Sequence, residues 1–214
     1  MSWRIALSWL AAALLAAGPA RAADIDELTT AAYRNNGREV TSLLMKGVDP
    51  NGRDSQGRSP LEVAIREESP KSLQALLDYP GLNIDAANGV GETPLMLAAL
   101  KGQLDWVKTL AARGAKIDKD GWTPLHYACS GPDNGIAAWL IAKGAAIDAR
   151  SPNGTTPLMM AARYGPYDLA EQLLKLGADP TLRNQLGLTA ADFAAAAERE
   201  KLHKLLLQRQ QQGR

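Results

Sequence analysis

Apolar residues in this chain of 214 residues fall into pairs of short helical stripes, and the pair recurs about every 33 residues. The pattern is clearest over residues 93–121, where Thr93 and Pro94 are typical of a helix start and Gly102 of a helix end. A second helix then runs to Gly114, and an outward hairpin follows it. The apolar positions of the two helices are Leu95, Leu97, Ala98, Ala99, Leu104, Trp106, Val107 and Leu110.

The helix-start motif returns at a nearly fixed period. Its prolines are Pro60, Pro94, Pro124 and Pro157, spaced 34, 30 and 33 residues apart, and Ala190 follows 33 residues after the last of them. A period of this size indicates stacked units instead of one central core. Isolated helices shorter than about 12–15 residues are marginal in water, so each helix must bury its stripe against neighbouring units. The predicted fold is an all-α solenoid.

The first and last units are more polar than the middle ones, as the ends of an open stack need to be. We predict a repeat array over residues 23–207, with about six repeats counting both capping units. The approximate repeats are 24–57, 58–91, 92–121, 122–154, 155–187 and 188–207. Residues 208–214 lack apolar side chains, and we expect them to fray.

The N-terminal segment has the composition of a secretory signal. Arg4 precedes the apolar run Ile5–Ala17, whose 13 residues are too few to cross a bilayer, which needs roughly 20. Ala20 and Ala22 supply the small residues that signal peptidase recognises. We predict a signal peptide over residues 1–22, cleavage after Ala22, export to the bacterial periplasm and no stable membrane anchor. An apolar leader that stays attached is the alternative.

Charge and cysteine content narrow the possible partners. The net charge of the chain is +1, and it becomes −1 once residues 1–22 are removed, so no basic excess favours nucleic acid. Cys129 is the single cysteine and cannot form an internal disulfide. Stability must therefore come from packing alone.

The motifs of this chain resemble those of the ankyrin repeat. Residues 123–128 read Thr-Pro-Leu-His-Tyr-Ala, residues 140–145 read Leu-Ile-Ala-Lys-Gly-Ala, and residues 173–179 give a second copy of that ending. The resemblance covers about residues 26–207. It implies helix-turn-helix pairs joined by outward hairpins, a binding module without catalysis of its own, and similarity to small exported ankyrin proteins of Gram-negative bacteria.

The resemblance also bears on the histidine of the motif. In ankyrin repeats this histidine bonds to the backbone of the neighbouring hairpin, which implies a structural role for His126. The sequence departs from the pattern at Glu62, Met96 and Met159, which stand where the family often has histidine. No acid–base partner recurs beside His126, so we expect no catalytic residue.

Cys129 aligns with Ala99 and Ala162, positions that we expect to be interior, which favours a small buried group. A redox function would need an exposed thiolate with a low pKa. Two histidines and one cysteine far apart in the sequence do not form a zinc site. We predict no metal and no cofactor.

The tryptophans outside the leader occupy three different environments by alignment. Trp106 matches Ile136 and is predicted to lie in the core, whereas Trp139 matches polar positions on the outer side of its helix. Trp122 lies just before a helix start, at the inward-facing base of a hairpin where ankyrin arrays usually contact partners. An exposed tryptophan there either anchors an interface or is incidental.

One hairpin is shorter than the others. From the glycine that ends each second helix to the next helix-start position there are 13 residues in four repeats, but only 10 from Gly114 to Pro124. Trp122 lies beside this gap of three residues. The shortened hairpin either forms a notch for a protruding part of a partner or is a deletion that costs little.

The predicted function is protein binding on a rigid scaffold. The partner is one folded protein, an envelope enzyme or a toxin, and the array is expected to be a monomer. The alternatives are a secreted effector acting in another cell and a thiol-dependent redox or stress factor using Cys129. The candidate partner contacts are Arg58, Arg66, Glu92, Leu100, Lys101, Trp122, Ser130, Thr155, Arg163 and Tyr164.

Overall fold

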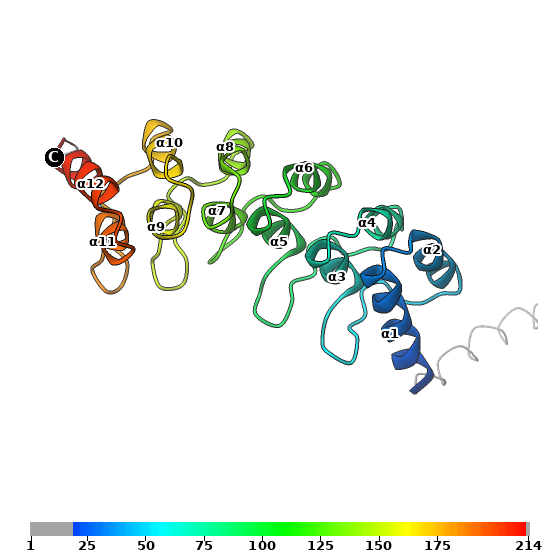
Figure 1. The fold of residues 1–214 in the computed structure, drawn as a ribbon. Coiled ribbons are helices and arrows are strands. Elements are labelled where there is room, and N and C mark those ends of the chain that lie inside the picture. Colours follow the sequence, from blue (N-terminus) through cyan, green and yellow to red (C-terminus); the bar gives the residue numbers. More distant parts are fainter. Residues whose placement is uncertain (1–18, 213–214) are drawn as a thin grey trace, which may run out of the picture. The chain divides into compact units, whose positions relative to one another are not determined.

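The computed structural model describes residues 19–212, with side chains from residue 24 onward. Most of the predicted signal peptide, residues 1–18, therefore lies outside the described residues. Within the described range every regular element is an α-helix (Figure 1). The chain divides into two compact units, whose described parts are residues 19–82 and 83–212. The all-α fold class predicted from the sequence is confirmed.

Unit 1 contains two helix pairs. Its helices are α1 (Pro19–Tyr33), α2 (Gly37–Met45), α3 (Pro60–Arg66) and α4 (Pro70–Leu77). The first helices α1 and α3 pack together, as do the second helices α2 and α4. Leu28, Val40, Ile65 and Leu76 are fully buried between them. The predicted cleavage position after Ala22 falls within the first turns of α1.

Unit 2 repeats the same arrangement four times. Its helices are α5 (Pro94–Leu100), α6 (Leu104–Ala112), α7 (Pro124–Ala128), α8 (Asn134–Ala142), α9 (Pro157–Arg163), α10 (Leu169–Lys175), α11 (Ala190–Ala196) and α12 (Glu200–Gln212). The first helices α5, α7, α9 and α11 form one row, and the second helices α6, α8 and α10 form a second row, drawn above the first in Figure 1. The small residues Ala98, Ala128 and Ala161 are fully buried, which lets neighbouring first helices approach closely.

The helix starts follow the predicted chemistry. Thr93, Thr123 and Thr156 are extended N-cap residues, and each hydroxyl accepts a hydrogen bond from the backbone N–H three residues later. Proline occupies the next position, where a missing N–H costs nothing. The side chain of the third helical residue then accepts from the N–H of the threonine, closing a capping box.

The hairpins of unit 2 are joined by a row of aspartates, each four residues after a helix-ending glycine. Each carboxylate accepts from a backbone N–H of the next hairpin, so one repeat fixes the register of the next. The bonds are Lys116 N to Asp85 Oδ1 at 3.0 Å, Ala146 N to Asp118 Oδ2 at 3.0 Å, and Asp179 N to Asp148 Oδ1 at 3.1 Å.

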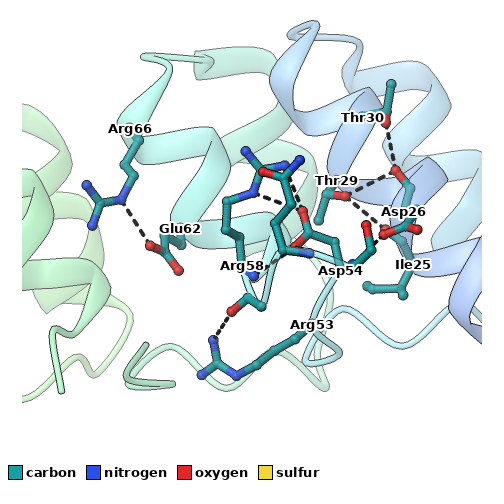
Figure 2. A network of polar contacts seen from close by, with 12 residues as sticks. Ile25, Asp26, Thr29, Thr30, Arg53, Asp54, Arg58, Glu62 and Arg66 are labelled. Carbon is teal, nitrogen blue, oxygen red and sulfur yellow. Dashed lines mark hydrogen bonds and ion pairs between the residues drawn. The ribbon is translucent and has the colours of Figure 1, made fainter. Parts of the chain in front are cut away.

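Unit 1 holds its hairpin with a related polar network (Figure 2). Asp26 Oδ1 accepts from Ser55 N at 2.7 Å, which ties the hairpin to α1. Asp54 Oδ1 accepts from Arg58 N at 2.8 Å, and the same pair forms an ion pair at 2.8 Å. Burial acts to raise the pKa of Asp54, but hydrogen bonds from Arg58 outweigh it and leave that pKa below its usual value.

Two expectations need correction. Helix α12 continues to Gln212, and Gln210 Nε2 donates to Pro180 O at 2.9 Å, so residues 208–212 belong to a helix, which we did not predict from the sequence. Trp106 is only partly buried, whereas Ile136 and Leu169 at the equivalent position are buried. The indole is larger than these aliphatic side chains and extends beyond the space between repeats.

Candidate binding surface

Unit 2 carries an apolar pocket of about 480 Å³ on its first helices. Three successive repeats form it, because residues on or directly beside α5, α7 and α9 line it. The lining residues are Leu100, Trp122, Tyr127, Ser130, Met160 and Tyr164. Four of them, Leu100, Trp122, Ser130 and Tyr164, are among the contacts predicted from the sequence.

Sequence reasoning missed Tyr127 and Met160. Both stand three residues after the helix-start proline, and the same position in α5 is the buried Leu97. The sequence did contain an indication of these two residues, since two successive repeats carry a long side chain at that position. Their partial exposure could not be predicted from the sequence, because it depends on how far the neighbouring helix covers them.

Trp122 is held in place from behind. Its ring meets the ring of His126 edge-on, with centroids 5.2 Å apart and an angle of 76° between the planes. His126 is itself fully buried and hydrogen-bonded on both ring nitrogens. The exposed face of the tryptophan is therefore ordered before any partner arrives.

The rim of the pocket carries aromatic and charged groups. Tyr164 is 56% exposed, and the Arg163 guanidinium lies 5.3 Å from the centroid of its ring. The Tyr127 hydroxyl donates to Glu92 Oε1 at 3.2 Å, which holds that carboxylate beside a residue of the pocket lining. Lys101 is exposed at the end of α5. Large aromatic groups beside arginine are typical of interface hot spots.

Thr155 does not belong to this surface, contrary to the prediction. It is 2% exposed, and its N–H donates to Ser151 Oγ at 3.0 Å. Its carbonyl accepts from Ser151 N at 3.0 Å and from His126 Nε2 at 2.9 Å. The residue closes the hairpin, and alignment with exposed Arg58 could not reveal that.

The two predicted contacts in unit 1 are both paired. Arg58 forms the ion pair with Asp54 described above, and Arg66 Nε donates to Glu62 Oε1 at 3.0 Å. Both arginine side chains remain more than a third exposed. These i,i+4 pairs hold the guanidinium groups in fixed directions at the surface of unit 1.

His126 has the structural contacts that the resemblance implied. Its Nδ1 accepts from Thr123 N at 3.2 Å, so Nε2 carries the proton and donates to Thr155 O. Burial lowers the pKa of His126, although the bond to Thr155 acts in the opposite direction. The ring is committed to backbone partners in two repeats, which leaves it unsuited to proton transfer with a substrate.

Cys129 is fully buried, and burial raises the pKa of its thiol far above the usual range. The redox alternative therefore lacks the exposed thiolate that it needs. Trp139 is partly exposed, with Lys143 Nζ 5.7 Å from its ring centroid. Within residues 19–212 no group of three metal-ligating side chains is found, and no helix is long and apolar enough to span a membrane.

Comparison with known families decides what these stacked pairs are. The family profile for ankyrin repeats in three copies matches residues 80–151, 114–184 and 133–213, which together cover more than half of the chain. The chain belongs to the ankyrin-repeat family.

Curated ankyrin proteins are similar only over part of their length. The chicken nuclear factor NF-kappa-B p105 subunit is 34% identical over 152 residues, which are 68% of this chain and 16% of that protein. The human transient receptor potential cation channel subfamily A member 1 is 30% identical over 178 residues, again 16% of its length. These relatives identify the repeat and not a shared whole-protein activity.

A solved structure is similar over nearly its whole length. The matching chain comes from the complex of a predatory endopeptidase of Bdellovibrio bacteriovorus with an immunity protein. It has a TM-score of 0.73 and 29% sequence identity, with 85% of this chain and 97% of that chain covered. The ankyrin-type neighbour in that complex is the immunity protein, which binds a protein partner. Ankyrin arrays are in general protein-binding modules, and the apolar pocket lies on a first-helix surface suited to that use.

Proposed function

We propose that this ankyrin protein is a non-catalytic binding module of the bacterial periplasm that binds one folded protein partner through the apolar pocket. The observation that carries the proposal is the pocket itself. It combines two tyrosines and a tryptophan in one hollow, supported by helices of three repeats. Contiguous exposed apolar groups with a polar rim are characteristic of protein interaction sites.

The pocket is preorganised, which favours binding of a rigid partner. Trp122 is fixed by the buried His126, and Tyr127 is fixed by its bond to Glu92. Little side-chain entropy is left to lose when a partner arrives, so more of the gained contact energy appears as affinity. A large apolar side chain of the partner would fill the hollow, while Arg163 and Lys101 would contact its polar surroundings.

The partner class that we propose is an exported enzyme or toxin. The structural neighbour is an immunity protein in complex with an endopeptidase, and the similarity to this chain covers 97% of that neighbour. A hydrolase acting in the envelope is accordingly the first partner to test. The leader-like residues 1–22 support periplasmic location, which N-terminal sequencing of the mature protein and cell fractionation would check.

The decisive experiment compares three purified forms in affinity capture from an envelope extract. We expect the wild type to retain a defined protein and the Trp122→Ala, Tyr164→Ala double variant to lose it, with at least tenfold weaker affinity for that protein once purified. Trp139→Ala is the matched control, since it removes an indole from the second-helix side. Equal capture by all three forms would refute the proposal.

A thiol assay separates this proposal from the redox alternative. The native protein is expected to resist a thiol-labelling reagent and to take up one label per chain after denaturation, because Cys129 is fully buried. Rapid labelling of the native protein would reopen the thiol-dependent function.

A further inference from the structure

The full-length hairpins of unit 2 each have a polar residue that holds the tip. In the hairpin of residues 145–155, Ser151 Oγ accepts from Thr155 N at 3.0 Å and Ser151 N donates to Thr155 O. Asn88 and Asn184 do the same through Oδ1, which accepts from the backbone N–H groups two and four residues later. These contacts close each tip on itself.

The short hairpin keeps its connection to the next repeat but loses this tip. Asp118 follows Gly114 by four residues, as Asp148 follows Gly144, and it bonds to the next hairpin in the same way. Trp122 follows Asp118 by four positions, whereas the equivalent Thr155 follows Asp148 by seven. The three missing residues therefore correspond to the tip and not to the inter-repeat ladder.

Neighbouring full-length tips contact each other directly. Gln185 N donates to Asn153 O at 3.0 Å, Gln185 Nε2 donates to Pro152 O at 2.8 Å, and Arg150 donates to Arg183 O at 2.7 Å. On the other side of the same hairpin, toward residues 116–121, the structure has an open cleft of about 640 Å³. That volume is within the range of ligand-binding clefts, about 300–1,000 Å³.

The cleft is lined by charged groups and by small residues. Lys116, Lys119 and Arg150 supply three cations, against the carboxylates of Asp118 and Asp120. Asp118 keeps its negative charge while its two oxygens accept from Ala146 N at 3.0 Å and Lys119 N at 2.9 Å. With both carboxylates counted, the lining side chains carry one more positive than negative charge, and Lys116 and Lys119 are exposed.

We propose that this cleft binds a protruding acidic loop of the protein partner. The missing tip provides the space, and Lys116 and Lys119 provide charge-assisted hydrogen bonds to carboxylates of that loop, while the Arg150 guanidinium, which donates to Arg183 O, adds positive charge. The inference rests on the proposed function, because it adds a second contact beside the apolar pocket. Specificity would then come from a loop that full-length hairpins would exclude.

The test fills the cleft by lengthening the short hairpin of the protein itself. Ser-Pro-Asn, the sequence of residues 151–153, is inserted between Asp120 and Gly121 to rebuild a tip, a change that lengthens a surface loop and costs little stability. The probe is a cyclic peptide presenting Asp-Glu-Asp, and its twin presents Asn-Gln-Asn. Binding to the full chain is followed by amide chemical shifts in nuclear magnetic resonance.

We expect saturable shifts at residues 116–121 and 146–150 with the acidic peptide, and at least tenfold weaker binding by the insertion variant and by Lys119→Glu. Lys201→Glu, on exposed α12, is the matched control and should bind within twofold of the wild type. Equal binding of the amide twin, shifts spread over the whole surface, or unchanged binding by the insertion variant would each overturn the inference.

The outcome is separable from that of the proposed function. Trp122→Ala, Tyr164→Ala should lose the captured partner and still bind the acidic peptide at the cleft. If the insertion variant keeps full affinity for the captured partner, the cleft inference fails while the apolar pocket stands. If the pocket variant keeps the partner, the proposed function fails whatever the peptide does.

Discussion

Helices α7 and α9 begin in the same way and differ at their third residue, which is His126 in α7 and Met159 in α9. Each side chain accepts from the N-cap threonine, Thr123 N to His126 Nδ1 at 3.2 Å and Thr156 N to Met159 Sδ at 3.4 Å. Only His126 also reaches the next repeat, where its Nε2 lies 2.9 Å from Thr155 O. Any acceptor at this position can complete the helix start, but joining two repeats needs a second polar atom.

The other first helices of unit 2 support this distinction. In α5, Met96 Sδ accepts from Thr93 N at 3.1 Å, and in α11, Asp192 Oδ2 accepts from Thr189 N at 2.7 Å. The bond from Thr189 lowers the pKa of Asp192, because it stabilises the charged form. Sulfur is a weak hydrogen-bond acceptor, so a capping box closed by methionine stabilises its helix less than one closed by histidine or aspartate.

The largest effect is expected from removing the histidine. His126→Ala should lower the free energy of unfolding by about 3 kcal/mol, since it leaves buried polar partners unsatisfied and opens a cavity. Met159→Ala should cost about 2 kcal/mol, because it removes packing and a weak acceptor only. Urea denaturation followed by circular dichroism measures both, with exposed Lys204→Ala as a control expected within about 0.5 kcal/mol. A larger loss for Met159→Ala would break the comparison.

Acidification should weaken the α7 junction specifically. The pKa of His126 is lowered in the folded state, so the unfolded chain binds a proton first as the pH falls below about 6.5. Stability should be full above that pH and decline down to the folded pKa, by about 1.4 kcal/mol for each unit between the two values. Denaturation midpoints measured between pH 7.5 and 5 test this. The same decline in His126→Met would assign it to other groups.

Removing the N-cap threonines should also lower stability more in α7 than in α9, but by a smaller amount. Thr156→Ala is expected to cost about 1 kcal/mol through the lost cap. Thr123→Ala should cost a few tenths more, because its hydroxyl also lies 2.8 Å from His126 Nδ1. Thermal unfolding of the two variants in parallel gives the comparison, and equal losses would mean that this contact adds nothing.

The smallest expected effect is a gain. Met159→His should raise the free energy of unfolding by about 0.5–1 kcal/mol, because the new Nε2 would face Leu188 O, the carbonyl equivalent to Thr155 O. Met45→His, at a position 84% exposed, is the matched control and should change stability by less than about 0.5 kcal/mol. A destabilised Met159→His would show that the α9–α11 junction cannot accept the ring.

Much of the fold could be predicted from the sequence, whereas the binding surface could be predicted only in part. The Thr-Pro starts and glycine ends placed the helices of unit 2, since these residues act through local backbone geometry. Four pocket residues were found by alignment of repeats. Thr155 was misplaced and Tyr127 was missed, because exposure at those positions depends on contacts with the neighbouring repeat.

The period, the capping residues and the small residues of the first helices by themselves determined a stack of ankyrin repeats, because those features act within one unit or at a regular interface. They also located the shortened hairpin. Only the tertiary structure decided that Trp122 rests on His126, that an apolar pocket spans three helices, and that the missing tip leaves an open cleft. These features arise between repeats, where the shape of a surface depends on side chains some thirty residues apart in the sequence.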